Sequence, residues 1–212
     1  MKKITLITML LLTAFIANAQ SDKGDFELGG NIGLNFSNIA ISGANMPTTS
    51  TSSRTSFNIS ATGEYYFSDR WGIKAKIIID NKGWSDNFIN IFDDNGDVIE
   101  TKNGDTVLNY ISVPVMANWH FGKKRNWYLN FGLYYASLVN AEIAEIDVSE
   151  SFNTSDAGLT FGIGVKFPIS DKAKLFIEYD AQSGFSNIAK ESGAATVSNG
   201  RSSLNIGVLF NL

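Results

Sequence analysis

The chain has 212 residues, with 21 acidic residues against 17 lysines and arginines, and its formal net charge is −4. Because cysteine is absent, the sequence excludes disulfide bonds, thiolate metal sites, a cysteine nucleophile and a lipid-modified N-terminal cysteine. The acidic balance leaves no basic surface for nucleic acid, and no Pro-rich or charge-block linker divides the chain. We therefore expect one domain, no nucleic-acid partner and no cofactor.

The N-terminus has the three parts of a secretory signal peptide. Two lysines form a short basic head, residues 4–16 form an almost unbroken apolar run, and residues 17–19 (Ala-Asn-Ala) form an A-x-A cleavage site. Residues 1–19 are predicted to be removed on export, which leaves a mature domain of residues 20–212 with a net charge of about −6. No later stretch reaches the roughly 18 apolar residues that a transmembrane helix needs, so a membrane crossing would have to use strands.

The mature chain contains eight runs in which apolar and polar residues alternate with a period of two. In chain order they cover residues 26–36, 57–67, 71–79, 111–119, 127–135, 159–167, 175–179 and 204–212. In the first run, Phe26, Ile32 and Phe36 share one face, while Glu27 and Asn31 occupy the other. A helix would need a period of 3.6, which none of the runs has. All eight are therefore predicted to be strands.

The connections between these runs are alternately short and long. Short turns are centred on residues 68–70, 122–125 and 169–172, whereas long connections cover residues 37–53, 85–105, 140–153 and 186–199. Outer-membrane barrels have this asymmetry, together with an even number of strands and both termini in the periplasm. The sequence predicts an all-β, eight-stranded antiparallel transmembrane up-and-down β-barrel with its long loops outside the cell.

The residue types on the two faces of the predicted strands indicate which face lines the interior of the barrel. Alternation alone also fits a soluble barrel whose apolar side chains point inward. However, the polar face consists largely of Gly, Ser, Asn and Thr, which suits the narrow, side-chain-filled interior of an eight-stranded barrel. Trp71, Trp119 and Trp127 lie on the apolar face and flank the short turns, where a periplasmic aromatic girdle would lie. Both features favour the membrane barrel.

Charged residues of both signs fall on the predicted lumen face. They are Glu27, Glu64, Lys74, Lys76, Asp80, Lys166, Glu178 and Asp180. Because an unpaired buried charge is costly, we expect these side chains to pair and form a structural polar cluster that closes the lumen. Glu178 and Asp180 have a spacing compatible with acid/base chemistry, but the lysines on the same face favour mutual neutralisation. A diffusion pore is disfavoured as well, since aqueous channels need about 16 strands.

Candidate catalytic and metal-binding residues are few. His120 is the only histidine, so a Ser-His-Asp hydrolase would depend on it. It lies beside the second short turn, away from the outer leaflet where a lipid-modifying barrel enzyme would act, so a hydrogen-bonding role is expected instead. Residues 93–97 (Asp-Asp-Asn-Gly-Asp) lack the spacing and closing glutamate of an EF-hand and predict a hairpin turn. No catalytic, cofactor-binding or metal site is predicted.

The long connections and one strand carry further local signals. The second connection holds six acidic residues against Lys102, and the third holds four acidic residues and no base. We expect an acidic, solvated loop surface, with cation binding or adhesion as the alternative. Asn103-Gly104 suggests a second chain reversal, the Thr/Ser-rich residues 48–53 suggest an unordered segment, and Pro114 suggests a β-bulge.

Four segments resemble the motifs of PorT-like outer-membrane β-barrel proteins. Residues 108–115 resemble the L-x-Y-[ILV]-x-[ILV]-P strand and residues 131–135 the G-x-Y strand, while residues 156–165 are similar to the D-x-G-x-x-x-G-x-G strand and residues 179–188 to the Y-x-x-G-x-x-N-I ending. The resemblance covers essentially the whole mature chain and implies a barrel in the outer membrane rather than an activity. One departure is Leu212, because many barrels end in an aromatic residue that is read during assembly.

These observations favour an integral outer-membrane protein with a structural or surface-interaction role and no catalytic activity. Its expected partners are outer-membrane lipids and the barrel assembly machinery. The resemblance to the PorT-like family adds an alternative, an accessory role in protein secretion or assembly with secretion components as partners. A small-solute pore is the least favoured function, because an eight-stranded lumen is narrow.

Overall fold

The computed structural model describes residues 22–43, 46–93 and 95–212. The signal peptide predicted at residues 1–19 lies outside the described residues. The elements in the described part are β1 (Phe26–Gly43), β2 (Met46–Ser50), β3 (Arg54–Ser68), β4 (Trp71–Phe92), β5 (Val98–Phe121), β6 (Trp127–Ile143), β7 (Ile146–Asp147), the 3-10 helix η1 (Ser149–Ser151), β8 (Ser155–Pro168), β9 (Ala173–Gly184) and β10 (Ala195–Asn211). Within these ranges, no helix is long and apolar enough to cross a membrane.

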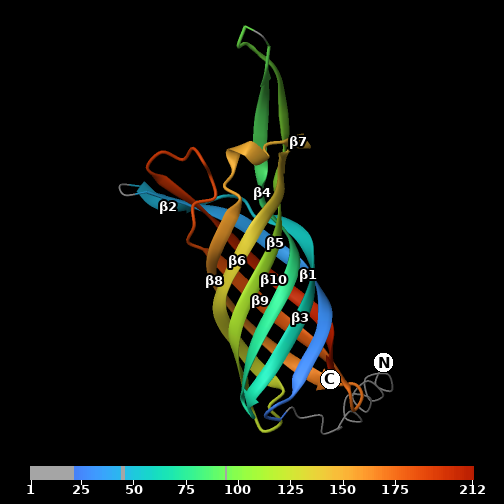
Figure 1. Ribbon diagram of the computed structural model, residues 1–212. Helices are drawn as coiled ribbons and strands as arrows, with labels where there is room; N and C mark the ends of the chain where they lie inside the picture. Colours follow the sequence, from blue (N-terminus) through green and yellow to red (C-terminus); the bar gives the residue numbers. More distant parts are fainter. Residues whose placement is uncertain (1–21, 44–45, 94) are drawn as a thin grey trace, which may run out of the picture.

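Eight of these strands form a closed antiparallel barrel (Figure 1). The order around the ring is β1, β3, β4, β5, β6, β8, β9 and β10, and pairing of β10 with β1 closes it. The predicted runs all lie within these strands, apart from Leu212 at the end of the chain. The fold class expected from the sequence, an eight-stranded antiparallel up-and-down barrel, is confirmed.

The two faces of the barrel wall have opposite chemistry, as the period of two in the sequence dictates. On β4, Ile77 is 60% exposed on the outer surface, whereas the adjacent Lys76 is 2% exposed inside the barrel. Ile79 of β4, Phe57 of β3 and Leu133 of β6 are likewise exposed on the outer surface. The alternative of a barrel with apolar residues inside is therefore wrong.

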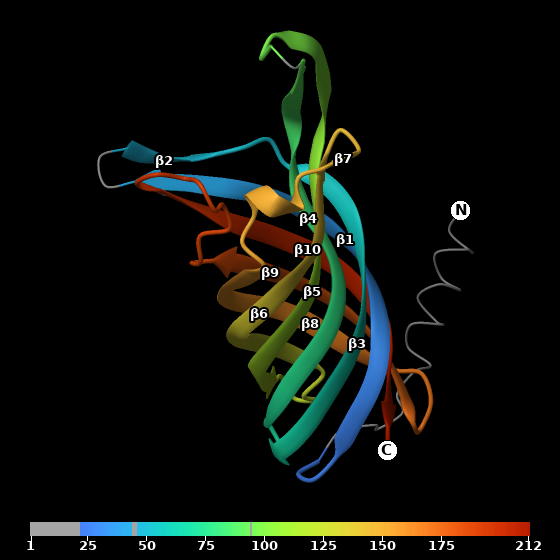
Figure 2. The ribbon, with the colours of Figure 1, turned by 45° about the horizontal axis from the view of Figure 1, so that its top comes forward.

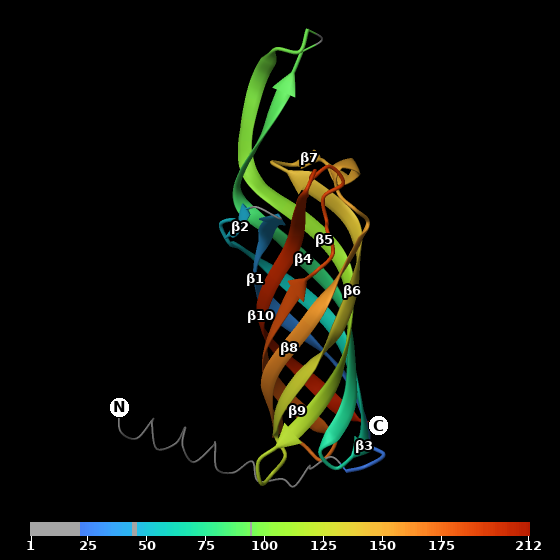
Figure 3. The ribbon, with the colours of Figure 1, turned by 90° about the vertical axis from the view of Figure 1, so that its left-hand side faces the viewer.

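The short turns and the long connections lie at opposite ends of the barrel. The β3–β4, β5–β6 and β8–β9 turns are at the lower end in Figure 1, where β1 begins and β10 ends. The opposite end, called the loop end below, carries β2, β7, η1 and the outer parts of β4 and β5 (Figure 3). The alternation of connection lengths predicted from the sequence therefore matches the structure.

The second long connection is mostly strand. β4 and β5 continue beyond the other loops as a two-stranded ribbon (Figure 3). The hairpin turn predicted at residues 93–97 is confirmed: Oδ1 of Asp93 accepts hydrogen bonds from the backbone N–H groups of Asn95 (2.9 Å) and Asp97 (3.0 Å). The N–H of Asp97 contributes most to holding the pKa of the exposed Asp93 carboxyl below its usual value.

Two predictions for the long connections are wrong. Asn103 and Gly104 do not reverse the chain, because both pair with β4 inside the continuous ribbon. Here cross-strand pairing overrides the local turn preference of the Asn-Gly pair. The Thr/Ser-rich residues 48–53 are not an unordered segment, because residues 48–50 belong to β2, which pairs with β1 and leans out to one side of the barrel mouth (Figure 2).

Pro114 does not lie at a bulge. The register between β4 and β5 is the same on both sides of it, with Ala75 opposite Val115 and Ile78 opposite Ser112. Within the described ladder, Val113 and Pro114 have no partner on β4, in keeping with the missing N–H of proline. On the other side of β5, Pro114 stays in register with Tyr134 of β6. The wall therefore accommodates the proline by a local gap in its hydrogen bonds rather than by an extra residue.

Gly164 of β8 faces the lumen, where the ring of Tyr128 fills the space that a side chain would need. Tyr128 is fully buried, so it has little room to move in a close-packed interior. We expect Gly164→Ala to lower the free energy of unfolding by about 1–3 kcal/mol, measured by urea denaturation in lipid vesicles. Gly63→Ala is the matched control, since a Cβ there would lie 3.5 Å from Phe26 in ordinary contact. Equal losses at both positions would contradict this packing role.

Candidate functional site

All eight charged residues predicted for the lumen lie inside the barrel, and none is more than 3% exposed. They form three layers together with four further charged residues. The lower layer, next to the short turns, contains Glu27, Glu64, Lys166 and Lys174; the middle layer contains Lys74, Lys76, Glu178 and Asp180; and the upper layer contains Asp80, Lys82, Asp156 and Arg201. An eight-stranded barrel is narrow enough for side chains from opposite walls to meet.

The lower layer is a network around two glutamates. Nζ of Lys174 donates to Glu27 (2.5 Å), and Nζ of Lys166 donates to both Glu27 and Glu64, the latter at 2.7 Å. The hydroxyl of Tyr66 accepts a third hydrogen bond from Lys166 (2.7 Å). Glu64 and Lys166 come from β3 and β8, which are four strands apart in the ring. Their ion pair therefore crosses the full width of the lumen.

The middle layer is built around Glu178. Its two carboxylate oxygens accept hydrogen bonds from Lys74 and Lys76, and the amide of Asn130 donates a further one at 2.9 Å. Lys76 also donates to Asp180 at 3.0 Å. β4 carries the lysines and β9 the acids, and these strands are again four positions apart. Because buried ions are stabilised only when their hydrogen bonds are satisfied, this arrangement fixes the two walls against each other.

The upper layer connects the middle layer to the loop end. Nη2 of Arg201 donates to Asp180 at 2.5 Å, and its Nη1 lies 3.4 Å from Asp80. Beside this pair, Nζ of Lys82 donates to Asp156 at 3.3 Å. β4, β8, β9 and β10 thus take part in a polar network that spans the two layers, because Asp180 of the middle layer pairs with Arg201 of the upper layer.

The sequence pattern alone misses four members of this network. The predicted set has five acids and three lysines, and the structure adds Lys82, Lys174, Arg201 and Asp156, so that the described lumen holds six acids and six bases besides His120. Lys174 directly precedes the predicted run of residues 175–179, and Asp156 begins the motif segment of residues 156–165. Lys82 and Arg201 lie beyond the predicted run ends at residues 79 and 204, where only the full strand lengths reveal them.

An apolar cluster, called the loop-end plug below, lies at the loop end of the barrel. Its buried members are Ile39, Leu108, Tyr110, Tyr134, Ala136, Ala141, Phe152 and Ile188. Phe152 and Ile188 come from two different connections, which a hydrogen bond from the N–H of Asn153 to the carbonyl of Ile188 (2.8 Å) holds together. The sequence prediction placed Ile39, Phe152 and Ile188 in loops and therefore missed the plug.

His120 is buried beside the lower layer. Its Nε2 lies 2.6 Å from Oε1 of Glu64 and 3.2 Å from the side-chain amide of Asn118, and its Nδ1 lies 3.2 Å from the carbonyl oxygen of Arg125. In the described part of the chain, no serine or threonine hydroxyl is bonded to it. The arrangement connects the second short turn to the lumen network.

The three predicted girdle tryptophans lie on the outer surface near the short turns. The rings of Trp71 and Trp119 are 6.3 Å apart, and Phe121 continues the row, at 5.3 Å from Trp119 and 6.5 Å from Trp127. Other outward aromatic residues near the same ends of the strands are Phe26, Tyr65, Phe67, Phe167 and Phe210. An apolar belt bordered by aromatic rings is the outer surface of a barrel that spans a bilayer.

Comparison with known proteins agrees with this geometry. The crystal structure of the outer membrane protein OprG from Pseudomonas aeruginosa has a TM-score of 0.55 at 14% identity, covering 92% of this chain and 98% of that chain. The solid-state NMR structure of the outer membrane protein AlkL has a TM-score of 0.54 at 10% identity, covering 90% of this chain and 91% of that chain. At these identities the likeness concerns the fold alone. No curated protein matches the sequence.

A family model connects the fold to a cellular location. It is described as the outer membrane protein beta-barrel domain, and it matches residues 18–190, which is well over half of the chain. The match covers most of the barrel strands, including the charged residues of β3 and β4 and those of β8 and β9 that meet in the lumen. The apolar belt and polar interior described above are the features that this location requires. The chain belongs to the outer membrane protein beta-barrel domain family.

Proposed function

We propose that this outer-membrane protein is a closed barrel with a structural or surface-interaction role. The observation that carries the proposal is the filled lumen. Ion pairs such as Glu64–Lys166 and Lys74–Glu178 cross its full width, and the loop-end plug lies above them. An eight-stranded barrel filled in this way has no room for a wide aqueous channel.

In planar lipid bilayers, the purified wild-type barrel is expected to give no steady porin-like current. Any brief events should be independent of the size of added sugars, because the ion-paired side chains occupy the lumen. A general porin of about 16 strands, inserted into the same bilayers, provides the positive control. A stable, large conductance from monomeric protein would contradict the closed lumen and favour a small-solute pore.

The β4–β5 ribbon supports a role in surface interaction. It reaches beyond the other loops (Figure 1), and it exposes Phe88, Phe92 and Ile99, of which Ile99 is 65% exposed. Apolar side chains that neither a core nor the membrane belt covers are typical of contact surfaces. The acidic residues Asp97 and Glu100 lie beside them, which favours a partner with basic groups over the alternative of an inert solvated loop.

The proposal includes an orientation in the membrane. The N- and C-terminal strand ends and the short turns would face the periplasm, and the acidic loop end would face outward, as in other outer-membrane barrels. A signal peptide at residues 1–19 would direct export and leave a mature N-terminus near Gln20. Outer-membrane lipids would contact the apolar belt, and the barrel assembly machinery would insert the chain.

The proposal also includes the absence of catalysis. His120, the residue on which a histidine-dependent hydrolase would rely, is buried at the end of the barrel near the short turns and bonded to Glu64, Asn118 and a backbone carbonyl. Glu178 and Asp180, the candidate acid/base pair, are both engaged by lysine or arginine side chains. These contacts favour structural roles for all three residues.

A second candidate is an accessory role in protein secretion or assembly, which the resemblance to PorT-like proteins suggests. The exposed basic turn residues Lys123 and Lys124 would then present a contact surface on the periplasmic side, beside Arg125, whose side chain is mostly buried and pairs with Asp22 and Asp69. Cross-linking in intact cells separates the candidates. Recovery of secretion components would favour the accessory role, and their absence from the cross-linked products would favour the surface role.

A further inference from the structure

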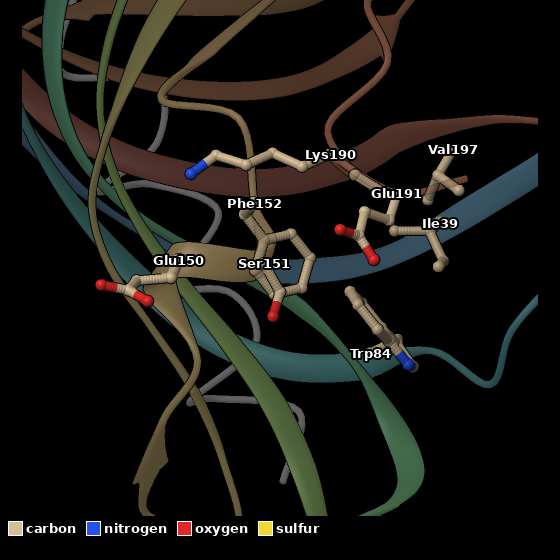
Figure 4. Close-up of a pocket in the computed structure, with 9 residues that line it drawn as sticks. Ile39, Trp84, Glu150, Ser151, Phe152, Lys190, Glu191 and Val197 are labelled. Atoms are coloured by element: carbon tan, nitrogen blue, oxygen red, sulfur yellow. The ribbon is translucent and has the colours of Figure 1, made fainter. Parts of the chain in front are cut away.

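A pocket of about 550 Å³ lies at the loop end (Figure 4). Ile39 of β1, Trp84 of β4 and Val197 of β10 line it together with Phe152 and Ala189 from the neighbouring connections. Its volume falls within the roughly 300–1,000 Å³ of small-molecule sites, which are mostly apolar with a few polar groups. Ile39 and Phe152 also belong to the loop-end plug, so the pocket rests on the closed part of the barrel.

Backbone hydrogen bonds join the walls of the pocket, one between the β6–β8 and β9–β10 connections and one between the β9–β10 connection and β10. The N–H of Lys190 donates to the carbonyl of Ser151 (3.0 Å), and the N–H of Ile188 donates to the carbonyl of Val197 (2.8 Å). The rings of Trp84 and Phe152 meet edge to face, with their centroids 6.2 Å apart. A pocket whose walls are already fixed binds a ligand without the cost of ordering its own loops.

The rim of the pocket carries more negative than positive groups, and their side chains extend in different directions. Glu150 and Glu191 contribute two carboxylates against the single ammonium of Lys190. Figure 4 shows the carboxylate of Glu191 between Phe152 and Ile39, whereas the side chain of Lys190 extends to the opposite side. In this view the charged group on the Phe152 and Ile39 side of the pocket is therefore the carboxylate of Glu191.

We propose that this pocket binds a small cationic amphiphile, a ligand with a flat apolar body and a protonated amine. The body would lie against Trp84 and Phe152, and the ammonium would donate a charge-assisted hydrogen bond to Glu191. The aromatic rings add to the attraction for a cation. Because the plug and the ion-paired lumen lie beneath it, the site would hold the ligand at the surface rather than pass it inward. This inference goes beyond the proposed function, since it assigns a ligand class to the loop end.

The test uses the full-length mature barrel in lipid nanodiscs and three indole probes that differ in charge. Tryptamine carries the ammonium, tryptophol is its neutral counterpart, and indole-3-propionate carries a carboxylate. Binding is measured by isothermal titration calorimetry, with empty nanodiscs subtracted to remove adsorption to lipid. We expect saturable binding of tryptamine at least about tenfold tighter than that of either other probe, which corresponds to about 1.4 kcal/mol.

Matched variants locate the site. Glu191→Gln is expected to weaken tryptamine binding about tenfold and to leave tryptophol binding unchanged, whereas Glu100→Gln on the distant ribbon should change neither. Ala189→Phe should abolish binding of all probes by filling the pocket, and Val197→Trp fills it from the other wall if the first variant does not fold. Equal affinities for the three probes, no saturable binding above empty nanodiscs, or binding that survives in a folded filled variant would each overturn the proposal.

Discussion

Glu178→Gln is expected to destabilise the barrel strongly, by about 3–5 kcal/mol. The substitution keeps the volume of the side chain but removes the charge that Lys74 and Lys76 share. Lys76 keeps Asp180 as a partner (3.0 Å), whereas Lys74 would be left as a buried ammonium without an opposite charge in contact. The free energy of unfolding is measured by urea denaturation in lipid vesicles.

Two variants separate the loss of the ion pair from other effects of the substitution. Glu100→Gln makes the same chemical change on the exposed ribbon and should stay within about 0.5 kcal/mol of the wild type. Combining Glu178→Gln with Lys74→Gln removes both charges of one pair, and it should be less destabilising than the sum of the single changes, which a double-mutant cycle measures. Strict additivity would mean that the two side chains do not stabilise the barrel as a pair.

Ile77→Arg should be the most damaging change on the outer surface. Ile77 lies in the middle of the barrel part of β4, opposite Ala61 of β3, and points away from the lumen. An arginine at the middle of the bilayer costs about 2–4 kcal/mol in a membrane barrel. We expect a loss of stability of that size in vesicles, measured again by urea denaturation.

The matched control is Ile99→Arg, because Ile99 is exposed on the ribbon beyond the barrel and should tolerate the charge. Similar losses at both positions would contradict the placement of the bilayer around the barrel. Lys76→Ser, which the alternation alone suggests as a mild comparison, is unsuitable because Lys76 pairs with Glu178 and Asp180. The pattern identifies the face on which a side chain lies, but not the partners that it has there.

The barrel strands and the direction of their side chains could be predicted because the bilayer imposes a strict period of two. Ile77 and Lys76 are neighbours in the sequence, and their opposite faces follow from that period alone. The pairing of Lys76 with Glu178 could not be predicted, because the two residues are 102 positions apart. It depends on the number of strands between β4 and β9 and on the register of every ladder in between.

Beyond the membrane the period weakens, and there the predictions fail. Arg201 lies in β10, although the apolar alternation that predicted this strand starts only at Leu204. Residues 48–50 belong to β2 although they are all Thr or Ser. Outside the bilayer, backbone pairing no longer requires an apolar outer face. The loop-end plug was missed for the same reason, since Ile39 and Phe152 are isolated apolar residues within polar segments.

The ion pairs between strands four positions apart have a consequence for assembly. In a growing, still open sheet, Lys74 on β4 and Glu178 on β9 cannot face each other across an interior, because that interior exists only once β10 has met β1. Until then both charges must remain hydrated, and lipid would penalise an incomplete sheet that carried them into the hydrocarbon layer. We therefore expect insertion and closure to be coupled, so that the N-terminal strands enter the hydrocarbon layer together with the C-terminal ones rather than ahead of them.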